Sequence, residues 1–136
     1  MPMPMVKGWK INPFNQTITR VEWPQHNTHA MYALLSTPHN EVECFDHVTF
    51  SETEGVYVDD EGLLRWQGKQ QEFFLLAHES FTREVPLAGN GLVCAVDDEG
   101  NSVDSQLTHE QLRSMIQWID VNDLVRRARA GAFDAS

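Results

Sequence analysis

Hydrophobic and polar residues alternate in the N-terminal part of the chain. Residues 17–23 read Thr-Ile-Thr-Arg-Val-Glu-Trp, a period-two pattern that is typical of a half-buried strand. Residues 6–11 supply the partner strand, and the segment between them, Asn-Pro-Phe-Asn-Gln, is rich in turn-forming residues. The pattern therefore predicts a β-hairpin.

The middle of the chain repeats this kind of pattern. Residues 42–50 alternate apolar with polar or charged side chains, which predicts another strand. A second hairpin is predicted from residues 56–58 and 63–66, joined by the turn Asp-Asp-Glu-Gly at residues 59–62. Residues 73–77 form a short apolar run of the length that a buried strand needs.

The stretch from Pro86 to Ile119 has the clearest organisation. Residues 92–96 are continuously apolar, which favours a core strand, and a second Asp-Asp-Glu-Gly turn ends it at residues 97–100. Thr108 and Gln111 have the spacing of a capping box. A helix is predicted after them, with one apolar face made by the following residues: Leu112, Met115, Ile116 and Ile119.

Two further helices are expected. A short one covers residues 30–35, with Thr28 as its N-cap and Pro38 beyond its end. A last one runs from Asn122 to Arg129. Between residues 78 and 91 lies a long connection with little periodicity.

These elements predict an α+β fold. We expect a single domain over residues 1–136, with an ordered core at about residues 6–119 and a helical C-terminal tail at residues 120–136. The core is a mostly antiparallel sheet of six or seven short strands. It packs against one main helix, Leu112–Ile119, and a short N-terminal helix, because amphipathic elements bury their apolar faces against another layer.

Composition narrows the functional classes. The net charge is −10, and no apolar run reaches the length of a membrane span. An acidic surface opposes phosphate binding, so we expect neither direct nucleic-acid binding nor a membrane partner. The N-terminus lacks the apolar segment of a signal peptide, and Cys44 and Cys94 are expected as buried thiols. We therefore expect a cytoplasmic protein.

The acidic residues are concentrated in one region. Residues 41–61 contain eight carboxylates and no Lys or Arg. We interpret part of this region as an acidic interaction surface for a protein partner, made by these residues: Glu52, Glu54, Asp59, Asp60 and Glu61. A solvated surface that aids solubility is the alternative interpretation.

Catalytic and metal-binding patterns are weak. Neither Asp-Asp-Glu-Gly copy has the ligand spacing of a calcium loop, and the histidines lack a partner motif for zinc. The chain has no Gly-x-Ser-x-Gly segment and no cysteine beside a positioned histidine. We therefore name no catalytic residue, metal ligand or cofactor and lean against an enzyme. The irregular connection supplies the candidate ligand-binding residues His78, Arg83 and Asn90.

Several segments carry a resemblance. Glu43-Cys-Phe-Asp, the run from Val56 to Leu64 and the run from Pro86 to Val93 resemble a family of small proteins common in bacteriophages and related mobile elements. The similarity covers about residues 10–119, and no reaction has been assigned to the family. The resemblance implies a phage-linked protein acting in the host cytoplasm and supplies no catalytic residues.

Three functions are compatible with the sequence. The leading hypothesis is a non-catalytic binding protein that engages a host protein through its acidic side. The second is a small-molecule binder or enzyme that uses the loop at residues 78–91. The third is a structural or assembly role as a homodimer through the helix at residues 124–129.

Overall fold

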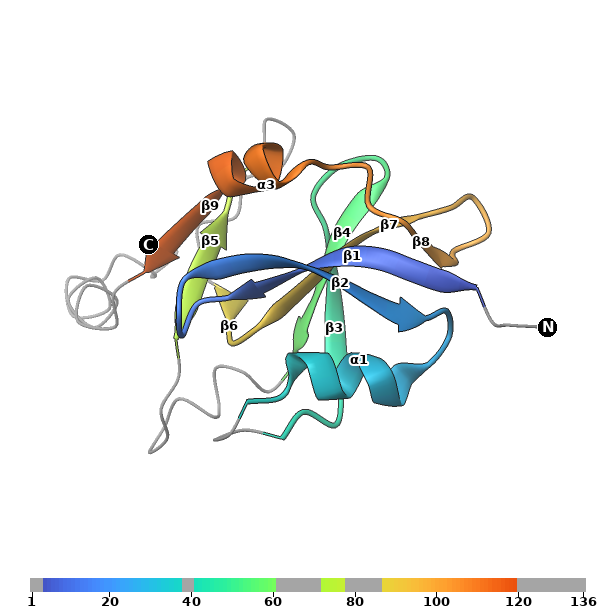
Figure 1. Cartoon of the computed structure of the whole chain (residues 1–136), viewed down its shortest axis with the longest axis horizontal. Helices are drawn as coiled ribbons and strands as arrows, with labels where there is room; N and C mark the ends of the chain where they lie inside the picture. Colours follow the sequence, from blue (N-terminus) through green and yellow to red (C-terminus); the bar gives the residue numbers. More distant parts are fainter. Residues whose placement is uncertain (1–3, 38–40, 61–71, 78–86, 120–136) are drawn as a thin grey trace, which may run out of the picture.

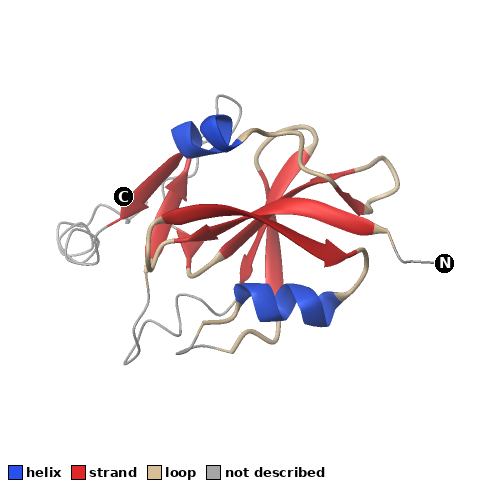
Figure 2. Ribbon diagram, in the orientation of Figure 1, coloured by secondary structure: helices blue, strands red, loops and turns tan. Residues whose placement is uncertain are grey.

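The described part of the chain is built from two antiparallel β-sheets and two short helices, as the computed structural model shows (Figure 1, Figure 2). The structure describes residues 4–37, 41–60, 72–77 and 87–119. The elements in chain order are β1 (Met5–Asn12), β2 (Thr17–Pro24), α1 (Thr28–Leu35), β3 (Phe45–Thr49), β4 (Glu54–Asp59), β5 (Phe73–Leu76), β6 (Leu87–Ala88), β7 (Gly91–Val96), β8 (Ser102–Val103), α3 (His109–Met115) and β9 (Ile116–Ile119). The predicted α+β class is confirmed.

Strand β7 lies at the centre of the larger sheet. The strand order is β2-β1-β7-β4-β3, and β8 folds back beside the end of β7. In the strand pairing, Val93 of β7 lies opposite Trp9 of β1 on one side and opposite Val56 of β4 on the other. Because β7 is covered on both faces, its first five residues are all buried, and this explains the continuous apolar run in the sequence.

The smaller sheet has the strand order β6-β5-β9. Two of the sequence predictions are wrong at this sheet. The described strands form two sheets rather than one, and the helix predicted to reach Ile119 ends at Met115. Residues 116–119 instead pair with β5, from Ile116 opposite Leu76 to Ile119 opposite Phe73. Ile and Trp favour strands, and the exposed edge of β5 offers their backbone groups hydrogen bonds that replace those of a longer helix.

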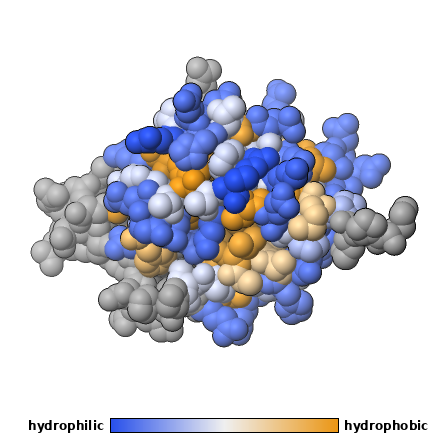
Figure 3. Space-filling view, in the orientation of Figure 1, coloured by the Kyte–Doolittle hydropathy of each residue, from blue (hydrophilic) through white to orange (hydrophobic). Residues whose placement is uncertain are grey.

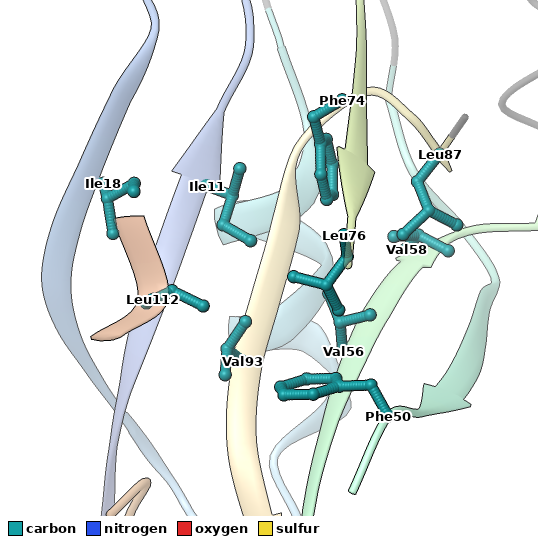
Figure 4. Packing of buried hydrophobic residues seen from close by; sticks show 10 residues of the cluster. All are labelled: Ile11, Ile18, Phe50, Val56, Val58, Phe74, Leu76, Leu87, Val93 and Leu112. Atoms are coloured by element: carbon teal, nitrogen blue, oxygen red, sulfur yellow. The ribbon is translucent and has the colours of Figure 1, made fainter. Parts of the chain in front are cut away.

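The two faces of the larger sheet are covered by different elements. One face packs against α1, where Met31 and Leu35 belong to the same buried cluster as Trp23 and Leu92. The other face packs against the smaller sheet and α3 (Figure 4). Figure 4 shows that cluster, whose buried members are Ile11, Ile18, Phe50, Val56, Val58, Phe74, Leu76, Leu87, Val93 and Leu112. Figure 1 places α1 and α3 on opposite sides of the molecule.

A glycine allows the two sheets to approach closely. A Cβ added to Gly91 would lie 2.9 Å from the ring of Phe74 and 3.0 Å from Val56. Real Cβ atoms essentially never come within 3.0 Å of such an atom, so a side chain at this position would require the buried Phe74 ring to shift.

Most local predictions near the chain start agree with the structure. The hairpin of β1 and β2 is confirmed, with Val6 opposite Trp23. The helix α1 is also present, but its N-cap is Asn27 rather than Thr28, because the Asn27 carboxamide accepts the Ala30 N–H at 3.0 Å. The strand predicted from residue 42 begins at Phe45 and pairs with β4. The predicted strand at 63–66 lies outside the described residues, as does the helix at 122–129.

The capping box is confirmed in full. The Thr108 hydroxyl accepts the Gln111 N–H at 3.1 Å, and the Gln111 side chain accepts the Thr108 N–H at 2.8 Å.

None of the helices in the described ranges has the length and apolar character needed to cross a membrane.

Candidate functional site

Of the predicted ligand-binding residues, the structure describes only Asn90. His78 and Arg83 lie outside the described residues. Asn90 is 3% exposed, and its side-chain amide donates to the carbonyl oxygens of Leu35 at 3.3 Å and Ser36 at 3.4 Å. These carbonyls belong to the C-terminal end of α1, which is left without intrahelical donors. Asn90 therefore ties α1 to the turn before β7, and its assignment as a ligand-binding residue stays a prediction.

The predicted acidic surface divides into buried and exposed members. Glu54 is 4% exposed, and its carboxylate accepts the Ser105 hydroxyl at 2.6 Å and the Gln106 N–H at 3.0 Å. Asp59 is 9% exposed at the end of β4. Neither can contribute to an exposed interaction surface, so this part of the prediction is wrong. Glu52 and Asp60 are exposed, and Glu61 lies outside the described residues.

The two Asp-Asp-Glu-Gly segments begin at opposite ends of a strand pair. The first begins at Asp59, the last residue of β4, and the second follows β7. Strands β4 and β7 are antiparallel, with Glu54 opposite Ala95 and Val58 opposite Gly91. Asp59 and Asp97 therefore leave the sheet in opposite directions. Within the described part of the chain, no three His, Cys, Asp or Glu side chains lie close enough together to hold a metal ion.

The second segment is a turn held by its own side chain. The Asp97 carboxylate accepts the N–H groups of Asn101 at 2.8 Å and Glu99 at 3.0 Å. These hydrogen bonds lower the pKa of Asp97, because they favour the charged form of the carboxylate. The hydrogen bond from the Asn101 N–H has the largest effect. Asp97 therefore acts as a turn former, which is what Asp does ahead of a glycine with positive φ such as Gly100, at 86°.

The two thiols differ strongly in environment. Cys94 is completely buried under α1, and burial raises the pKa of its thiol to about 11. Its thiolate, the nucleophilic form of cysteine, is therefore scarce at neutral pH. Cys44 is exposed, which corrects the expectation that both thiols are buried, and neither forms a disulfide.

Aromatic rings form a continuous row beside α1. Tyr32 of α1 contacts Phe45 of β3 at 5.4 Å between ring centroids, and Phe45 contacts Tyr57 of β4 at 4.9 Å. His29 and His47 lie at the two ends, 6.2 Å from Tyr32 and 4.5 Å from Tyr57. Each ring of the row contacts the next, and the Tyr57 hydroxyl is hydrogen-bonded to the Ser102 hydroxyl at 2.9 Å.

His47 stands in this row without a partner for one ring nitrogen. Its Nε2 atom is buried and lies against Gly55, where a Cβ would collide with the ring. Burial lowers the pKa of His47, and the negative charge of Asp46 opposes this shift. The imidazole is therefore a neutral packing group at pH 7.

A groove with an acidic rim lies at the exposed end of this aromatic row. Its volume is about 380 Å³, and we call it the acidic groove, lined by His29, Tyr32, Ala33, Ser36, Glu41, Val42 and Glu43. The Ser36 hydroxyl fixes its wall, because it accepts the Val42 N–H at 2.8 Å and donates to the Tyr32 carbonyl at 2.7 Å. Glu41 and Glu43 are exposed, while the Val42 side chain between them is buried.

A second groove lies on the other side of the molecule. Its volume is about 580 Å³, and we call it the cationic groove, lined by Gln16, Thr17, Ile18, Thr19, His109, Arg113 and Trp118. It brings together the start of β2, helix α3 and strand β9. Sequence reasoning missed it, because its residues come from segments about 90 positions apart that only the packing of the two sheets unites.

Comparisons of the chain with protein-family models, with curated proteins and with solved structures found no match. The resemblance to small bacteriophage proteins therefore stays a prediction. The site is defined by geometry alone, as two grooves of opposite charge.

Proposed function

We propose that this protein is a non-catalytic binding protein of phage origin that engages a host protein through its acidic side, in the cytoplasm. The observation that carries the proposal is the acidic groove, where exposed carboxylates border an aromatic and apolar recess. A Lys or Arg side chain of a partner suits such a recess. Its methylene stem would pack on the Tyr32 ring, and its charge would meet Glu41 and Glu43.

The groove is organised before any partner arrives. Tyr32 is held between His29 and Phe45, and the segment carrying Val42 is tied to the end of α1 by Ser36. Little side-chain entropy is then lost when a partner binds, which favours affinity.

The surrounding charge favours a basic partner. Asp60 lies at the same end of the sheet, where its N–H donates to the Cys44 carbonyl at 3.5 Å. The net charge of −10 would speed encounter with a positively charged protein, and this effect weakens as salt rises. Figure 3 shows a mainly hydrophilic viewed face with apolar atoms near its centre.

Affinity capture from a host-cell lysate tests the proposal. The full-length protein should retain a partner at low salt and release it at high salt, and mass spectrometry would identify that partner. The double variant Glu41→Gln/Glu43→Gln should lose it. The matched control, Asp98→Asn/Glu110→Gln, removes two exposed carboxylates that do not line the acidic groove and should retain the partner.

Three results would contradict the proposal. One is the absence of any retained protein at low salt. Another is a partner that resists high salt, and the third is equal loss of the partner from the control variant. Binding of a short Lys-containing peptide, followed through Tyr and Trp fluorescence, gives an independent measure of the same groove.

A further inference from the structure

The cationic groove is a second candidate binding site, distinct from the acidic groove. The described ranges contain only four Lys or Arg residues, which are Lys7, Lys10, Arg20 and Arg113. Arg113 lines the groove, and Arg20 follows directly on the β2 residues that line it. No lining residue is acidic, although Glu110 lies nearby on α3. In a chain of net charge −10, this local excess of positive charge favours an anionic ligand.

Arg20, which lies beside the groove, is held in place. The Arg20 guanidinium lies 4.7 Å from the centre of the Trp9 ring, a cation–π contact. Trp9 in turn makes an edge contact with His109 at 5.7 Å and donates its indole N–H to the Leu107 carbonyl at 3.1 Å. Arg20, Trp9 and His109 therefore form one connected border.

The groove also has a sheet edge on each side. β2 is the last strand of the larger sheet and β9 is the last strand of the smaller one, and both contribute lining residues. No other strand of the described chain pairs with the outer edge of either. Their outward backbone N–H and C=O groups are a template for an added strand, the recognition mode called β-augmentation.

We infer that the cationic groove binds an acidic segment of a partner protein in an extended conformation, as a strand added beside β2. Backbone groups of β2 bond the segment, its carboxylates meet Arg113 and Arg20, and its apolar side chains pack on Trp118. The sheet edges favour a peptide over a small anion, which has no backbone to pair. The overall negative charge disfavours a nucleic acid.

The test uses a synthetic peptide of alternating glutamate and valine and the full-length protein labelled with ¹⁵N. NMR titration up to about 1 mM peptide should shift the amide signals of residues 16–20 and 109–118. The variant Arg113→Gln should bind about tenfold more weakly, because a hydrogen bond to a charged group is lost. Lys7→Gln removes the same charge outside the groove and should bind like the unchanged protein.

Two further probes separate the alternatives. The same peptide with proline in place of valine keeps its carboxylates but loses half of its backbone donors, and it should bind much more weakly. A single-stranded DNA oligonucleotide of equal charge should also bind more weakly than the glutamate–valine peptide.

The inference is overturned by any of four results. These are no shifts at low salt, equal binding of the proline peptide, tighter binding of the DNA, or indifference to Arg113→Gln. Arg113 is exposed, so its variant is expected to fold, and its unchanged NMR dispersion would verify this. Because the test uses neither Glu41 nor Glu43, its failure would leave the proposed function of the acidic groove untouched.

Discussion

The two faces of the larger sheet are closed in different ways. On the α1 face, a single helix is tied down by polar contacts, among them those of Asn90 and Ser36. On the other face, a second sheet and α3 close over a large apolar cluster. Each cover leaves a groove at its margin, acidic beside α1 and cationic beside α3.

The difference shows how little net charge says about a surface. The charge of −10 suggests one uniformly acidic protein, but the fold places two Arg side chains and three aromatic rings together at one margin. The fold also buries Glu54 and Asp59, although acidic residues close to them in the sequence are exposed. The charge of a surface therefore has to be derived from the exposure of each residue.

The largest expected effect concerns the closure of the α1 face. Because the Cys94 thiol is buried with its pKa raised to about 11, it should react with a thiol reagent at least about a hundredfold more slowly than exposed Cys44. Kinetics with Ellman's reagent at pH 8 on Cys44→Ser and Cys94→Ser variants would measure each thiol alone. Similar rates would mean that α1 does not seal this face.

The next effect distinguishes a buried carboxylate from an exposed one. Glu54→Ala should lower the free energy of unfolding by about 3 kcal/mol, since it leaves Ser105 and the Gln106 N–H without their acceptor. Exposed Glu52→Ala should change it by less than about 0.5 kcal/mol. Urea denaturation of both variants provides the comparison, and equal effects would refute the assignment of Glu54 as a structural residue.

A smaller effect is expected from the tie between Asn90 and α1. Asn90→Ala should cost about 1 kcal/mol, because two long hydrogen bonds to carbonyls at the end of the helix are removed. Hydrogen exchange should accelerate in α1 and remain unchanged in β5 and β9. Uniform acceleration across both sheets would show that Asn90 supports the whole fold and not this one cover.

The smallest effect is a pH dependence. The pKa of His47 is lower in the folded protein than its ordinary value of 6.5, so between these two pKa values the unfolded chain binds more protons. Stability is therefore retained above pH 6.5 and falls as the pH drops toward the folded pKa. Urea denaturation at several pH values across this window should show that the free energy of unfolding of His47→Leu falls less steeply with decreasing pH. If the variant has the same pH dependence as the unchanged protein, other groups cause it.

Local sequence signals predicted the elements that local residues determine. The Thr108 and Gln111 capping box, the first hairpin and the apolar run of β7 all depend on neighbours in the chain. The sequence predicts a helix over residues 116–119, because Ile116 and Ile119 continue the spacing of an apolar helical face. Only the distant strand β5 makes them a strand.

The site was harder to predict than the fold. Glu54 shares the period of buried Val56 and Val58, so its burial could have been found from alternation alone. The burial of Asn90 could not, because its partners lie 54 and 55 positions away on α1. The cationic groove likewise exists only where β2 and β9 come together.

The central claim is that one small fold carries two binding surfaces of opposite charge. NMR titration of a single ¹⁵N-labelled sample, first with a Lys-containing peptide and then with the glutamate–valine peptide, tests it most directly. The first peptide should shift signals around residues 29–36 and 41–43, and the second those of residues 16–20 and 109–118. If both peptides shift one common set, or neither shifts any, the account is contradicted.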